Sequence, residues 1–137
     1  MKLHHIGKVV KDLSEARASY AGLFGMKALG EPVVDPLQKV AVQMLAFGSG
    51  ESPVIELVSP ISPESPVSKF LEKGGGLHHF CFEVDDMSKA IEELRGKGAL
   101  VLGKPVPGKG HGDRMTAWIY TPTKELIELV EAEKDKP

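Results

Sequence analysis

The stretch Leu3–Ala16, LHHIGKVVKDLSEA, returns in altered form as Leu77–Ala90, LHHFCFEVDDMSKA, at an offset of 74 residues. A second match lies near the end of each half, where Val54–Val58, VIELV, resembles Leu126–Val130, LIELV, at an offset of 72. Internal repetition of this kind indicates two copies of one structural unit. In the first match, seven of fourteen paired positions are identical: Leu3/Leu77, His4/His78, His5/His79, Val10/Val84, Asp12/Asp86, Ser14/Ser88 and Ala16/Ala90.

The repeat divides a single domain, residues 1–137, into two modules. We expect module one at residues 1–60, a helical connector at 61–75, module two at 76–132 and a charged tail at 133–137. Each module begins with a hydrophobic strand and an amphipathic helix and continues with three β-rich segments, which predicts an α+β fold with the order βαβββ, twice. The expected strands are Leu3–Val10, Val33–Val34, Val40–Phe47 and Val54–Val58 in module one, and Leu77–Val84, Leu100–Leu102, Met115–Tyr120 and Leu126–Val130 in module two.

The helices have recognisable ends. Ser14 and Ser88 are the expected N-caps of the two module helices, because a serine hydroxyl accepts a hydrogen bond from a free amide of the first turn. The connector is expected to begin with Pro66 at its first helical position. The expected buried faces are Leu13, Ala16, Tyr20 and Leu23 in the first helix, Met87, Ile91 and Leu94 in the second, and Val67, Phe70 and Leu71 in the connector.

Composition excludes several classes of protein. The chain is 42% hydrophobic and 26% charged with a net charge of -2, which argues against a nucleic-acid partner. No apolar run approaches the roughly 18–20 residues that span a bilayer, and Met1–His5 lacks the apolar stretch of a secretory signal. The single cysteine, Cys81, rules out an intramolecular disulfide framework and favours a cytoplasmic location. We therefore expect a small-molecule partner, with no nucleic acid and no membrane.

Polar residues inside the strands predict a metal site. Glu56 and Glu128 each lie between two apolar residues, and a histidine pair opens the first strand of each module. If the modules form a pseudo-twofold curved mixed sheet, two imidazoles and two carboxylates converge in a metal cleft and suit Co, Zn, Ni or Mn. Neighbouring strand residues point to opposite faces, so the pattern alone leaves open which histidine of His4/His5 and of His78/His79 faces the site.

The duplicated order of histidine and glutamate resembles the vicinal-oxygen-chelate, or glyoxalase/bleomycin-resistance, superfamily over nearly the whole chain. More specifically, several segments are similar to methylmalonyl-CoA epimerases: PISPESPVSKFLEK at 60–73, GLHHF at 76–80, EVDD at 83–86, HHIG at 4–7 and VKDL at 10–13. Some members of that family carry glutamine where this chain has Glu56. The resemblance implies a homodimer and the metal ligands His5, Glu56, His79 and Glu128.

The resemblance also implies a reaction in which a proton is removed from the carbon α to a thioester carbonyl. The substrates that it implies are acyl-CoA compounds. Glu128 is the expected base and Glu56 its pseudo-symmetric partner. A bound metal ion would stabilise the negative charge of the enolate, which makes removal of this weakly acidic proton feasible. Gln43 is the one polar residue of Val40–Phe47 and is expected to orient the substrate. In the glycine-rich stretch 107–114, Lys109 and Arg114 are expected to meet a carboxylate or a CoA phosphate.

Other functions fit the same pattern. A glyoxalase I-like lactoylglutathione lyase would apply the same metal and enolate chemistry to a hemithioacetal. An Fe(II) dioxygenase would need two histidines and one carboxylate, whereas this chain offers four ligands. A metal-free protein that binds a small molecule or drug between the modules is the alternative outside the enzymes, and metal analysis separates it from the others.

Overall fold

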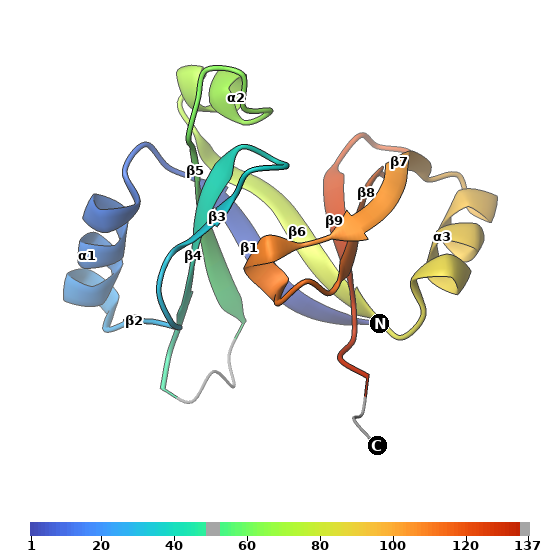
Figure 1. Cartoon of the computed structure of the whole chain (residues 1–137), viewed down its shortest axis with the longest axis horizontal. Coiled ribbons are helices and arrows are strands. Elements are labelled where there is room, and N and C mark those ends of the chain that lie inside the picture. Colours follow the sequence, from blue (N-terminus) through green and yellow to red (C-terminus); the bar gives the residue numbers. More distant parts are fainter. Residues whose placement is uncertain (49–52, 135–137) are drawn as a thin grey trace. The chain divides into compact units, whose positions relative to one another are not determined.

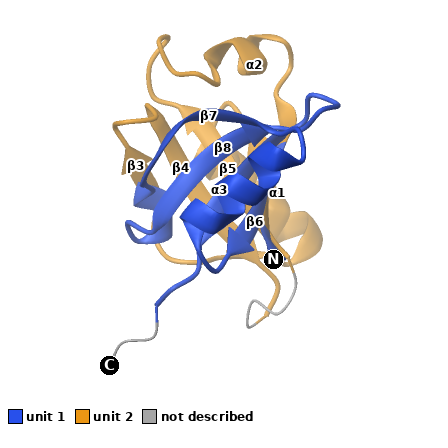
Figure 2. Ribbon diagram, turned by 90° about the vertical axis from the view of Figure 1, so that its right-hand side faces the viewer, with its two compact units in different colours: residues 1–4, 79–137 blue, residues 5–78 orange. Residues whose placement is uncertain are grey.

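The computed structural model describes residues 1–48 and 53–134, which form two compact units (Figures 1 and 2). Unit 2 comprises His5–His78 and thus holds module one and the connector. Unit 1 comprises His79–Pro137 together with Met1–His4, so the first four residues belong with module two. Of the expected tail, Glu133 and Lys134 have no regular secondary structure, and residues 135–137 lie outside the described part.

Unit 2 contains a small mixed sheet. Its strand order is β2-β4-β5-β1, with β3 paired to β4. β1 runs parallel to β5, whereas β4 is antiparallel to β5. The elements are β1 (Lys2–Val9, of which residues 5–9 belong to this unit), α1 (Leu13–Phe24), β2 (Lys27–Ala28), β3 (Val33–Asp35), β4 (Val40–Ala46), β5 (Val54–Pro60) and α2 (Ser68–Glu72).

Unit 1 repeats this arrangement with the strand order β6-β9-β8-β7. β6 runs parallel to β9, and β8 is antiparallel to β9 and to β7. The expected α+β class and the repeated βαβββ pattern are therefore confirmed, while β2 and η1 were not foreseen. The elements are β6 (Gly76–Val84, from His79 in this unit), α3 (Met87–Gly96), β7 (Leu100–Pro107), the 3-10 turn η1 (Lys109–His111), β8 (Met115–Tyr120) and β9 (Leu126–Glu131).

Each helix covers the apolar face of its own strands (Figure 1). In unit 2, Leu45 and Leu57 pack with Leu13, Ala16 and Tyr20 of α1. In unit 1, α3 buries Met87, Ala90 and Ile91 against β8 and β9, and Leu94 packs against this cluster. The connector face of Val67, Phe70 and Leu71 packs on Val9, Val40, Val42 and Val58.

Three expectations about the helices were wrong. The N-caps are Asp12 and Asp86, whose carboxylates accept hydrogen bonds of 3.0 Å from the amides of Glu15 and Lys89, because each aspartate stands three residues before a free first-turn amide. Leu23 is 72% exposed, since α1 contacts the sheet mainly through its first turns and middle.

The connector helix also begins later than expected. α2 starts at Ser68 with Val67 as N-cap, because Ser62–Val67 forms hydrogen-bonded turns first. Among residues 1–48 and 53–134, no helix is both long enough and apolar enough to cross a membrane.

Candidate metal-binding site

In unit 2, His5 and Glu56 lie on neighbouring parallel strands, β1 and β5. The register pairs Glu56 with Gly7, so His5, two residues before Gly7, leaves the strand on the same face as Glu56. His5 Nε2 lies 3.6 Å from Glu56 Oε1, and both side chains are almost completely buried. Because Gly7 has no side chain, nothing from its position fills the space between the histidine and the glutamate.

In unit 1, His79 and Glu128 repeat this arrangement on β6 and β9. His79 Nε2 lies 3.5 Å from Glu128 Oε1, and Cys81 occupies the register position that Gly7 has in unit 2. Two further side chains contact this pair. Trp118, opposite Glu128 on β8, packs edge to face on the His79 ring with centroids 4.8 Å apart, and His111 Nε2 lies 3.5 Å from Glu128 Oε2.

The spacing within each pair suits a cation better than a direct hydrogen bond. Nitrogen and oxygen joined by a hydrogen bond are usually about 2.9 Å apart. Two ligand atoms that each lie about 2.1 Å from a tetrahedral zinc ion are about 3.4 Å apart. The observed distances of 3.6 Å and 3.5 Å lie close to the second value. The residues of each unit therefore fit a divalent ion, which would also stabilise the buried carboxylate.

The histidine preceding each of these ligands makes different contacts. His4 Nε2 lies 3.0 Å from Arg114 NH2, and because arginine is only a donor, His4 accepts this hydrogen bond. The ring of His78 packs edge to face on Phe70, with centroids 4.9 Å apart. The geometry thus brings His5 and His79, and not His4 and His78, next to a glutamate of the same unit.

Gln43 lies on the other face of its sheet. Its register partner on β5 is Leu57, whereas Glu56 is opposite Met44, so Gln43 and Glu56 leave the sheet on opposite sides. The buried amide of Gln43 donates hydrogen bonds to the carbonyls of Gly30 and Met44. These contacts give Gln43 a structural role in holding the β2–β3 connection, and its contact with a substrate stays a prediction.

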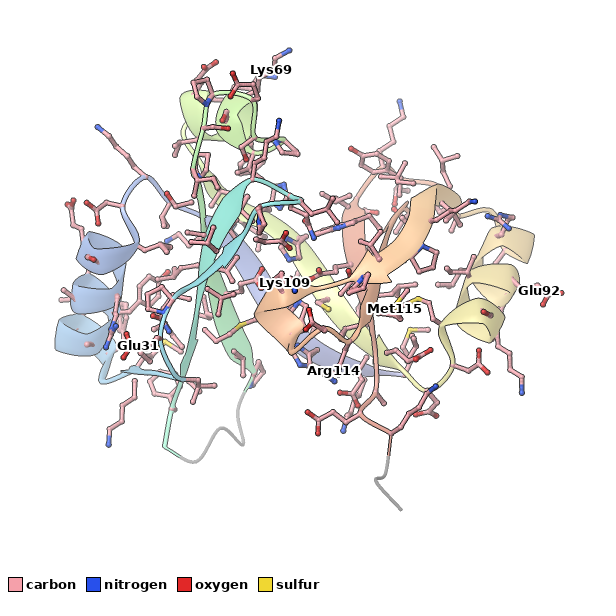
Figure 3. All side chains as sticks on the ribbon, viewed as in Figure 1. Glu31, Lys69, Glu92, Lys109, Arg114 and Met115 are labelled. Atoms are coloured by element: carbon pink, nitrogen blue, oxygen red, sulfur yellow. The ribbon has the colours of Figure 1, made fainter. Side chains whose placement is uncertain are left out.

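Lys109 and Arg114 both come from the connection between β7 and β8 (Figure 3). Lys109 is exposed and pairs with Asp113 at 3.0 Å. The Arg114 guanidinium is largely engaged within unit 1, because it donates to a carboxylate oxygen of Glu83 and to the carbonyls of Glu131 and His111, in addition to His4. The expected contact of either residue with a substrate carboxylate or phosphate stays a prediction.

Neither His111 nor Trp118 is among the site residues expected from the sequence. His111 lies in a turn whose counterpart in module one has no histidine, so the repeat gives no indication of it. The position of Trp118 could have been inferred, because two antiparallel strands place Trp118 opposite Glu128 once their register is known.

Comparison with known proteins agrees with this arrangement. Residues 4–117 match the family described as Glyoxalase/Bleomycin resistance protein/Dioxygenase superfamily. The chain is 38% identical over 114 residues to the ethylmalonyl-CoA/methylmalonyl-CoA epimerase of Cereibacter sphaeroides, a match that covers 81% of this chain and 82% of the relative. It is 35% identical over 113 residues to the mitochondrial methylmalonyl-CoA epimerase of Bos taurus, where the match covers 81% of this chain but only 62% of the bovine protein.

A solved structure has the same fold. The chain superposes on a methylmalonyl-CoA epimerase of Streptomyces coelicolor in complex with 2-nitronate-propionyl-CoA with a TM-score of 0.83 and 27% sequence identity. The superposition covers 98% of this chain and 99% of the other. The superposition therefore extends over both units.

Proposed function

As a member of the Glyoxalase/Bleomycin resistance protein/Dioxygenase superfamily and, within it, of the methylmalonyl-CoA epimerase family, this chain is an enzyme of the epimerase type, and we propose that it inverts a carbon centre α to a CoA thioester carbonyl with the help of a divalent metal ion. The observation that carries the proposal is the buried histidine–glutamate pair that each unit contains, at nearly equal spacing. Two equal pairs suit a single reaction centre that is built from both halves of a duplicated chain.

We propose that His5, Glu56, His79 and Glu128 are the ligands of one ion. Imidazole and carboxylate ligands in equal number are compatible with Co, Zn, Ni or Mn. When bound, the ion supplies positive charge that stabilises an enolate. Both pairs are almost completely buried, and electrostatic interactions are stronger in a buried site than in water.

The proton transfer itself is assigned to the glutamates. A carboxylate oxygen of Glu128 takes the proton from the α-carbon, and the electron pair of the C–H bond moves into the thioester carbonyl to give the enolate. Delivery of a proton to the opposite face then re-forms the C–H bond with inverted configuration. Glu56, the pseudo-symmetric residue, is our candidate donor: its protonated carboxyl group gives up this proton, and exchange with solvent afterwards deprotonates Glu128 and reprotonates Glu56. A positioned acid or base of this kind contributes about 10²- to 10⁴-fold to the rate.

The substrate class follows from the relatives. Because the C. sphaeroides relative is named for ethylmalonyl-CoA and methylmalonyl-CoA, we propose a short branched dicarboxylic acyl-CoA as the substrate. We also propose a homodimer, as the family resemblance implies, and a cytoplasmic location, which the single buried Cys81 supports.

The proposal is tested by metal analysis together with an exchange assay. Wild-type protein, loaded in turn with Co, Zn, Ni and Mn, is incubated with methylmalonyl-CoA in D2O, and deuterium incorporation at the α-carbon is followed by NMR. We expect one ion per chain and rapid incorporation. The hemithioacetal of glutathione and methylglyoxal serves as the substrate for the lyase alternative, and faster turnover of this compound would replace our assignment.

Variants identify the ligands. We expect His79→Ala and Glu128→Ala to reduce metal occupancy sharply, because each removes one ligand. His78→Ala is the matched control, since His78 is the neighbouring residue of the same strand and packs on Phe70. A wild-type protein that binds none of the four ions would favour the metal-free binding protein. Equal loss of metal in His78→Ala and His79→Ala would contradict the ligand assignment.

A further inference from the structure

Glu128 is contacted by two different imidazoles, one at each carboxylate oxygen. His79 Nε2 lies 3.5 Å from Oε1, and His111 Nε2 lies 3.5 Å from Oε2. All three side chains are at least 95% buried. The two oxygens of this carboxylate therefore have distinct surroundings, and only one of them is turned toward the histidine that we propose as a metal ligand.

The turn that carries His111 is held tightly by its own backbone. The amides of His111 and Asp113 both donate to the carbonyl of Gly108, each at 3.0 Å, and Gly108 donates to the carbonyl of Arg114 at 2.8 Å. A Cβ at Gly108 would lie 2.7 Å from Thr116 Cγ2 and 3.1 Å from His111 Cδ2. Glycine is thus required for the turn to approach β8 while the His111 ring lies beneath it.

Arg114 and His4 also restrain His111. Its Nε donates to the His111 carbonyl at 3.3 Å, and its NH2 group donates to His4 Nε2 at 3.0 Å. The His4 ring in turn meets the His111 ring edge to face, with centroids 5.5 Å apart. Arg114 therefore restrains the backbone of His111, and the His4 ring restrains its imidazole.

The repeat has no equivalent of this histidine in unit 2. The strand register places Trp118 opposite Glu128 and Met44 opposite Glu56, an offset of 74 residues. The same offset relates His111 to Leu37, which lies in the turn between β3 and β4 and is 66% exposed. The histidine–glutamate pair is thus kept in both halves, whereas the position equivalent to His111 is an exposed leucine in unit 2.

We propose that His111 is a positioning residue that fixes the orientation of the Glu128 carboxylate. Nε2 lies 3.5 Å from Oε2, farther than in a hydrogen bond but within the range of an electrostatic contact. This contact restricts rotation of the carboxylate and leaves Oε1 directed to the His79 side. Groups that orient a metal-ligating side chain in this way typically change metal affinity or activity by 10- to 100-fold when they are removed. The inference rests on the proposed function, because it gives Glu128 the roles of ligand and base.

The test compares three substitutions in the full-length protein. His111→Leu removes the contact, His111→Gln keeps an amide N–H donor at about the position of Nε2, and Leu37→Ala changes the equivalent turn of unit 2. For His111→Leu we expect kcat to fall about 10- to 100-fold with a smaller change in KM, and the dissociation constant for Zn²⁺ to rise. His111→Gln should restore most of both losses, and Leu37→Ala should match wild type.

A spectroscopic measurement on wild-type protein covers the case in which His111→Leu does not fold. In a Zn²⁺ titration of ¹⁵N-histidine-labelled protein, His5 and His79 should show the large shift of a coordinated ring nitrogen, and His111 only a small one. A coordination shift at His111, or wild-type kcat and Zn²⁺ affinity in folded His111→Leu, would overturn the inference. If wild-type protein binds no ion, the proposed function itself fails; if His5 and His79 bind the ion while His111→Leu behaves as wild type, only the role of His111 is lost.

Discussion

The two units contain the same histidine–glutamate pair in different surroundings. In unit 2, Glu56 has Gly7 and Met44 as its register neighbours, whereas in unit 1 Glu128 has Cys81 and Trp118. The histidine-to-glutamate distances are nonetheless 3.6 Å and 3.5 Å. Duplication has thus preserved the spacing of the histidine and the glutamate, while the side chains around them have diverged. We infer that the two glutamates differ in chemical role even though their backbone positions are equivalent.

The largest effect should come from replacing each glutamate by glutamine. Glu128→Gln removes the proposed base, and we expect kcat for α-proton exchange to fall about 10²- to 10⁴-fold. Glu56→Gln should have a smaller effect on this exchange, because Glu128 alone can remove the α-proton and return a deuteron, and an amide oxygen can still bind a metal ion. Both rates are measured by NMR in D2O with metal occupancy determined in parallel.

Two results would contradict the expected difference between the two glutamates. Equal losses of kcat at equal metal occupancy would mean that the two carboxylates act as equivalent bases. A greater loss in Glu56→Gln would reverse the assignment and make the carboxylate of unit 2 the principal base.

The two cores can be compared through Leu129 and Leu57, which are equivalent in the repeat and fully buried. Truncation of a buried leucine to alanine costs about 2–5 kcal/mol, and the cost is greater where the surroundings cannot relax. Leu129 lies in a cluster of eight buried residues, whereas the cluster of Leu57 has three buried residues and is completed by partly exposed ones. We therefore expect Leu129→Ala to lower the free energy of unfolding more than Leu57→Ala, measured by urea denaturation. The opposite order would show that cluster size does not determine the loss here.

The smallest effect concerns the helix caps Asp12 and Asp86. Loss of an N-cap carboxylate costs about 1 kcal/mol. Glu131 Oε2 accepts a hydrogen bond of 2.8 Å from the amide of Met87, so the first turn of α3 keeps a second acceptor when Asp86 is removed. Asp12→Ala should therefore lower the free energy of unfolding by more than Asp86→Ala. Serine variants at the same positions, Asp12→Ser and Asp86→Ser, are the controls and should retain most of the stability.

Much of the fold could be predicted from the repeat. β8 has the expected bounds, Met115–Tyr120, and β4, β5, β6 and β9 deviate from expectation by one or two residues at an end. The apolar and β-branched residues that mark these strands are recognisable from the local sequence alone. The pairing of each histidine with its glutamate was also foreseeable, because both residues recur together in the two halves.

The remaining features depend on contacts between distant residues. Serine and aspartate are both good N-caps, so the choice of Asp12 over Ser14 depends on where the preceding strand ends. The role of His111 depends on a turn that bends back over β8, which no periodicity encodes. Arg114 looked like a group for binding anions, yet its partners lie at positions 4, 83, 111 and 131.

The division between the units passes through β1 and β6 and constrains how the gene can be cut. Met1–His4 belong to unit 1 together with His79–Pro137. A fragment that starts after the connector therefore lacks the first four residues of unit 1. It would also lack His4, which accepts the hydrogen bond from Arg114. A separately expressed half that begins at His79 should therefore need Met1–His4 to complete its folding, whereas a half that ends at His78 contains the whole of unit 2.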